Sequence, residues 1–60
     1  MSTVYNPEAD LIAEIEKLEI DARNLRRSVE KATHAEDKRV LERQLREVEA
    51  RVDVLRKRLP

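Results

Sequence analysis

Apolar residues recur in this chain at alternating steps of four and three, in two registers that meet at Thr33. The members are Leu11, Ile15, Leu18, Ala22, Leu25, Val29 and Ala32 before the break, and Leu41, Leu45, Val48, Val52, Leu55 and Leu59 after it. Such spacing keeps one stripe of a helix apolar and turns it toward a partner helix. The two registers differ by two residues, which no single slip of three or four supplies. The pattern favours two helices folded back on each other over one long coiled coil.

Reversing the chain near Thr33 keeps the two apolar stripes in phase along the whole hairpin. The expected pairs include Leu25 with Leu41, Ala22 with Leu45, Ile15 with Val52, and Leu11 with Leu55. Polar residues then fall only at the two ends of the stack, where water is available. The sequence therefore predicts an all-α antiparallel helical hairpin.

Local signals give the expected helix boundaries. Asn6 before Pro7 is a typical helix start, because Asn caps free N–H groups and Pro suits the first helical position. Thr33 and Glu36 have the spacing of a capping box for the second helix. The prediction is one domain, with a flexible tail over 1–5 and two helices of equal length over 7–32 and 34–59.

A single continuous helix of about 80 Å is the alternative, because the chain has no glycine to end a helix near Ala32. Charge favours the hairpin. Residues 8–21 carry a net charge of −5 and residues 46–60 a net charge of +2, so a hairpin lays opposite charges side by side. A parallel dimer of long helices would instead place two acidic segments together.

Composition points to self-association. The chain has 60 residues, of which 43% are charged, and it has no cysteine. A lone core in a chain of this size rarely supplies more than about 3–5 kcal/mol. We call each of the two apolar stripes a seam. A single hairpin leaves its seams open to solvent on one side, and pairing two hairpins into a four-helix bundle would close them. We expect the seam residues other than Ala32 to form the oligomer interface.

The sequence gives little support to catalysis or metal binding. His34 is the only histidine, and there is no cysteine to share a metal with it. Two slender helices offer no concave, desolvated site in which paired carboxylates could act. We expect a non-enzymatic protein without cofactor or metal. No segment is apolar enough to span a bilayer, so we expect no membrane partner and a cytoplasmic location.

Basic residues near the turn suggest an alternative function. They are Arg23, Arg26, Arg27, Lys31, Lys38, Arg39 and Arg43. Together they could face phosphate, as in an RNA-binding regulator. The expected architecture resembles that of Rop, a dimeric hairpin bundle that binds paired RNA loops, in helix number, helix length and seam, without any shared motif. Acidic residues are interspersed in the patch and it contains no aromatic residue, and both observations weaken the hypothesis of RNA binding.

Four aliphatic residues fall outside the seams and suggest a second contact surface: Ile12, Ile20, Val40 and Val54. The favoured function is therefore a homo-oligomeric adaptor, scaffold or small regulator that binds itself and another protein. A pocket for a small anionic ligand between protomers is a further possibility.

Overall fold

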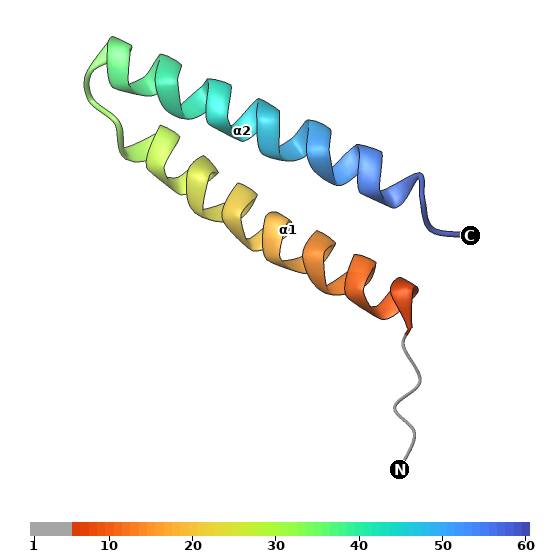
Figure 1. The fold of residues 1–60 in the computed structure, drawn as a ribbon. Helices are drawn as coiled ribbons and strands as arrows, with labels where there is room; N and C mark the ends of the chain where they lie inside the picture. The colour runs from red at the N-terminus through yellow and green to blue at the C-terminus, as the bar shows by residue number, and fades with distance from the viewer. Residues whose placement is uncertain (1–5) are drawn as a thin grey trace.

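The computed structural model describes residues 6–60, which form two helices side by side, running in opposite directions (Figure 1). Helix α1 spans Pro7–Lys31 and helix α2 spans Ala35–Arg56. The predicted hairpin is confirmed, and the continuous long helix is not what this chain forms. The tail expected over residues 1–5 lies outside the described residues.

Helix α1 begins as the sequence predicts. The Asn6 side chain accepts hydrogen bonds from the backbone N–H groups of Glu8, at 3.0 Å, and Ala9, at 3.4 Å. Pro7 occupies the first turn, where its missing N–H costs nothing. Glu8 and Asp10 also lie in this turn, where the helix dipole favours negative charge.

The turn is made without a left-handed residue. Ala32 has φ −66° and ψ 127°, and His34 has φ −99° and ψ 132°, so both are extended. Among the described residues none has a positive φ. The Ala32 N–H still bonds back to the carbonyl groups of Ser28 and Val29. Because the reversal uses extended residues, it needs no glycine.

The start of α2 differs from the prediction. The helix begins at Ala35 with His34 as its N-cap, and no side chain caps it. The Thr33 hydroxyl lies 3.2 Å from Nδ1 of His34, and the expected capping box with Glu36 does not form. The reason is the extended backbone at His34, which places Thr33 one residue too early to serve as the cap.

The two helices are also unequal, with 25 residues in α1 and 22 in α2. Helix α1 ends one residue before the expected boundary. Helix α2 ends at Arg56, and Lys57 and Arg58 form a turn that follows it. The prediction of equal arms is therefore wrong, although the heptad seams lie within the helices as expected, except for Ala32 and Leu59 at their ends.

The core is small and lies toward the chain ends. Four side chains are buried among the described residues: Ile15, Ala22, Val52 and Leu55, the last with 0% exposure. Three of them form one cluster, against which Leu11, Leu18 and Leu59 pack. In its thinnest direction the structure measures 11 Å, which is a single layer of helices. Neither described helix combines the length and apolarity needed to cross a membrane.

Candidate functional site: the two faces of the hairpin

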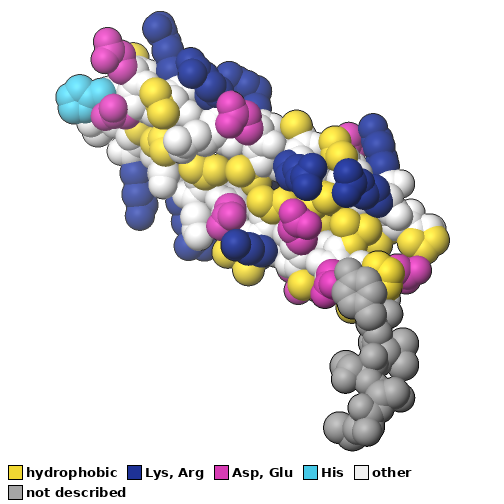
Figure 2. All heavy atoms as spheres, in the orientation of Figure 1, with side chains coloured by type: hydrophobic (Ala, Val, Ile, Leu, Met, Phe, Trp, Pro, Cys, Tyr) yellow, Lys and Arg dark blue, Asp and Glu magenta, His cyan; other side chains and the backbone are white. Residues whose placement is uncertain are grey.

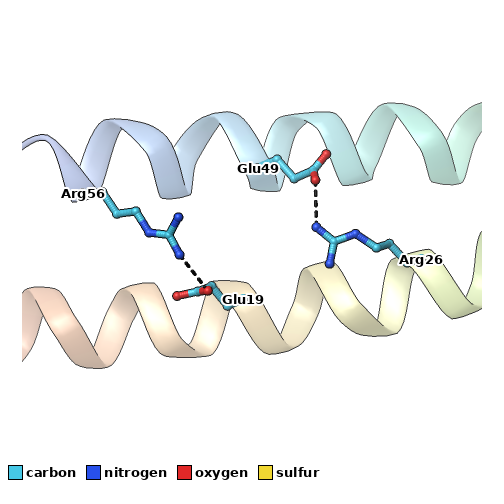
Figure 3. Close-up of polar contacts among 4 residues, drawn as sticks. All are labelled: Glu19, Arg26, Glu49 and Arg56. Carbon is cyan, nitrogen blue, oxygen red and sulfur yellow. Dashed lines mark hydrogen bonds and ion pairs between the residues drawn. The ribbon is translucent and has the colours of Figure 1, made fainter.

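One edge of the interface between the helices is closed by two ion pairs (Figure 3). Arg26 of α1 meets Glu49 of α2 at 2.8 Å, and Arg56 of α2 meets Glu19 of α1 at 2.8 Å. All four residues directly follow a seam residue in sequence, which places them on the same side of the seam. We call this side the ion-paired face.

The ion pairs lie over a shallow groove whose floor is formed by Ala22 and Val52. Arg23 and Asp53 complete its rim, so three arginines there are balanced by three acidic residues. The paired side chains remain between 43% and 57% exposed. Exposed pairs of this kind contribute about 0.2–1 kcal/mol each. They fix the register of the helices more than they stabilise them.

The register differs in detail from the pairing expected at the turn. Leu25 lines a groove with Val48, and Ala22 lines one with Val52. Both groove neighbours lie farther along α2 than the expected Leu41 and Leu45. Interdigitation accounts for the difference, since in a helical seam each residue inserts between several residues of the facing helix and not against one. Near the chain ends, the expected pairs Ile15 with Val52 and Leu11 with Leu55 do belong to one packed cluster.

The opposite edge of the interface is open. One groove there is lined by Leu25 and Val48 together with Asp21, Asn24, Ser28, Gln44 and Glu47. A second groove, nearer the turn, is lined by Ala32, Val40 and Leu41 together with Ser28, Lys31, Asp37 and Gln44. Asp21, Ser28 and Gln44 directly precede seam residues, so they lie on the other side of the seam from the ion pairs. We call this side the open face.

Figure 2 shows that hydrophobic side chains follow the line between the helices on the open face along most of its length. Helix α2 is uppermost in both Figure 1 and Figure 3, but the turn is on the left in Figure 1 and on the right in Figure 3. The two figures therefore show opposite sides of the hairpin. Figure 2, which has the orientation of Figure 1, shows the side opposite the ion pairs. One cross-helix pair belongs to the open face, Glu14 with Arg51 at 3.8 Å. It lies toward the chain ends and leaves the turn half of this face uncovered.

The predicted interface residues are brought together but are covered unequally. Ile15, Ala22, Val52 and Leu55 are buried. The others are only half-buried: Leu11, Leu18, Leu25, Val29, Leu41, Leu45, Val48 and Leu59. Most of the predicted seam therefore still faces solvent in one hairpin. That these residues form an oligomer interface stays a prediction.

The predicted basic patch is exposed at the turn end of both helices. Arg26 is held by Glu49, and Arg23 lies on the rim of the same groove as Glu19. Lys31 lies on the rim of an open-face groove with Asp37. The patch is therefore divided between the two faces, with acidic neighbours on each. Nucleic-acid binding by these residues stays a prediction.

The four aliphatic residues outside the seams are all exposed: Ile12 at 44%, Ile20 at 51%, Val40 at 51% and Val54 at 46%. Val40 lines an open-face groove, and Val54 lies two heptads farther along the same flank of α2. Ile12 directly follows Leu11 and so lies on the side of the ion-paired face, while Ile20 points away from α2. A single second contact surface for all four stays untested.

His34 lies at the turn and is exposed to solvent. Its side chain is 82% exposed and lies 3.9 Å from the carboxylate of Asp37. Within residues 6–60, no three His, Cys, Asp or Glu side chains gather in a way that could hold a metal ion.

The difference between the two faces was not anticipated from the sequence, where it is only slight. Residues that directly follow seam positions include the charged Glu19, Arg26, Glu49 and Arg56. Residues that directly precede seam positions include the uncharged Ser28 and Gln44 but also the charged Asp21 and Glu47. Comparison with protein-family models, curated proteins and solved structures found no match to this chain.

Proposed function

We propose that this protein is a non-enzymatic, homo-oligomeric helical hairpin that acts as a protein–protein interaction module. The observation that carries the proposal is the incomplete burial of the seam. Of the twelve predicted interface residues, one hairpin buries four and leaves eight half-exposed. A single layer of two helices has no second layer to cover its apolar side, and stable domains need one.

The mass of the protein in solution tests the proposal. Analytical ultracentrifugation at micromolar concentration should give at least twice the chain mass of 7.1 kDa. The double variant Leu18→Asp and Val48→Asp should be an unfolded monomer, because both seams then carry charges where apolar contact is needed. A folded, helical monomer for the natural sequence would overturn the proposal.

Ile20 is the residue through which a different protein could be bound. It is 51% exposed and faces away from α2, so a bundle built on the seams would leave it outside. A cross-linked partner should be lost on Ile20→Lys, while the mass of the homo-oligomer stays the same. Ala50→Lys is the control, because Ala50 is exposed on the outer side of α2. Unchanged partner capture by the Ile20 variant would contradict this role.

RNA binding at the turn end is the second candidate function. It is favoured by the charge of residues 23–44, which include seven Lys or Arg and four Asp or Glu. Contacts to phosphate release counterions and weaken steeply with salt, whereas apolar docking is nearly insensitive to it. Titrating an RNA duplex against the protein at salt concentrations from about 50 to about 200 mM, over which phosphate contacts lose much of their affinity, separates the two functions.

A further inference from the structure

We propose that the open face seats a second copy of this chain in antiparallel orientation, with the turn of each hairpin beside the chain ends of the other. The inference rests on the proposed self-association and adds to it a face and a direction. The ion-paired face is left toward solvent in this arrangement. The product is a four-helix bundle with two-fold symmetry.

The lining of the two faces decides which one is covered. On the ion-paired face, two Arg–Glu pairs at 2.8 Å span the helices over Ala22 and Val52, which are already buried. Covering this face would remove water from four charged side chains, which costs free energy. The open-face grooves instead contain half-exposed Leu25, Leu41 and Val48. Their rims carry the uncharged Ser28 and Gln44 and four charged residues, Asp21, Lys31, Asp37 and Glu47. Covering this face removes more apolar area from water than covering the ion-paired face, while the charged groups stay at the rims.

The distribution of charge decides the direction. Residues 23–44, the turn half, have a net charge of +3. The remaining residues carry six Lys or Arg and nine Asp or Glu, so the half near the chain ends has a net charge of −3. A parallel pair would place like halves together, and an antiparallel pair places each half beside one of opposite sign.

Helix α1 shows the complementarity most clearly. Its residues 8–21 carry six acidic residues and one base, and its residues 23–31 carry four bases and one acidic residue. When two hairpins stack face to face about an axis across their length, α1 lies along α1 of the second copy and runs the opposite way. The acidic half of each α1 then faces the basic half of the other.

The same operation accounts for two of the exposed aliphatic residues. Val40 and Val54 lie on the open-face flank of α2, one near the turn and one near the C-terminal end of the helix. Antiparallel stacking brings this flank of α2 against the same flank of the second copy. Both valines are thereby placed at the margin of the bundle, although each is about half-exposed in the single hairpin.

Four substitutions test the choice of face. Val40 and Ile20 are both 51% exposed, so a glutamate at either position disturbs the hairpin equally little. Sedimentation equilibrium should show that Val40→Glu and Val54→Glu raise the dimer dissociation constant at least tenfold. Ile12→Glu and Ile20→Glu should change it less than threefold. A dimer that Ile12→Glu weakens at least tenfold and that Val40→Glu and Val54→Glu leave unchanged would show that the ion-paired side is covered and would overturn the choice of face.

Spin labels test the direction. The sequence has no cysteine, so single cysteines introduced for labelling are unique. Glu36→Cys near the turn and Ala50→Cys near the middle of the hairpin both lie on the outer side of α2. In an antiparallel dimer the two Glu36 labels are separated by about the length of α1, roughly 37 Å, and the two Ala50 labels lie much closer.

Equal, short distances for both labels would show a parallel dimer and overturn the direction alone. A natural protein that sediments as a folded monomer would instead overturn the proposed function itself. A dimer that Val40→Glu leaves intact and Ile12→Glu dissociates would leave self-association standing and reject only the face.

Discussion

At the end of the hairpin that holds the chain termini, Asn6 caps α1 and a cluster of Ile15, Val52 and Leu55 is buried. At the turn end, α2 begins without a side-chain cap, and Leu25 and Leu41 are only half-buried. The seam pattern is equally regular in both halves, so its regularity does not decide which seam residues are buried. The strongest packing lies where the helices are not covalently joined.

Loop closure gives a physical reason for this arrangement. A contact next to the turn closes a short loop, whereas the contact of Ile15 with Val52 closes a loop of more than thirty residues. The entropy cost of closure grows with loop length. Helix ends far from the turn would therefore separate first if they were not well packed. The buried cluster holds the hairpin together at that end.

Leu55→Ala should remove the tighter packing that distinguishes the half near the chain ends from the half near the turn. Leu55 has no exposed surface, and a buried Leu→Ala change costs about 2–5 kcal/mol. This is comparable to the roughly 3–5 kcal/mol that a small core supplies. Circular dichroism at 222 nm should therefore show most of the helical signal lost at 25 °C, in contrast to the natural protein. A variant that stays helical with an unchanged melting temperature would show that the cluster is not what holds this end.

Val52→Ala and Val29→Ala sharpen the comparison, because they make the same chemical change in the two halves. Val52 is 7% exposed and packs in the cluster, whereas Val29 is half-buried and nearer the turn. We expect the Val52 variant to lose about 2 kcal/mol of unfolding free energy and the Val29 variant about half of that. Urea unfolding at matched protein concentration measures both losses. Equal losses would mean that the two halves are packed alike in solution.

The sequence was sufficient for the parts of the fold that depend on local chemistry and on periodicity. The two seams and the charge of residues 8–21 predicted the hairpin, and Asn6 with Pro7 predicted the start of α1. The start of α2 was missed because Thr33 and His34 compete for the N-cap, and the backbone of the turn decides between them.

The candidate site was only partly visible in the sequence. The seam residues were identified, but the ion-paired face required a register that only the packed helices provide. Arg26 lies 23 residues from Glu49 and Arg56 lies 37 residues from Glu19. At such separations a charge pattern is compatible with several registers, because a shift of seven residues preserves the seams.

The N-caps of the two helices allow a third test with smaller expected effects. A substitution at the cap of α1 should lower the stability, and one at the cap of α2 should raise it. Asn6→Ala removes a side-chain acceptor that two backbone N–H groups use, and should cost about 1 kcal/mol. His34→Asn adds an acceptor at an N-cap that has none and already has the extended backbone a cap needs, so it should gain up to about 1 kcal/mol. For a domain of this size, each change corresponds to a shift of about 4–8 °C in Tm.

Thermal melts of the two variants and of the double variant should show the two shifts adding, since the sites lie at opposite ends of α1. A melting temperature that falls in the His34 variant would show that its imidazole contributes a contact that the cap cannot replace.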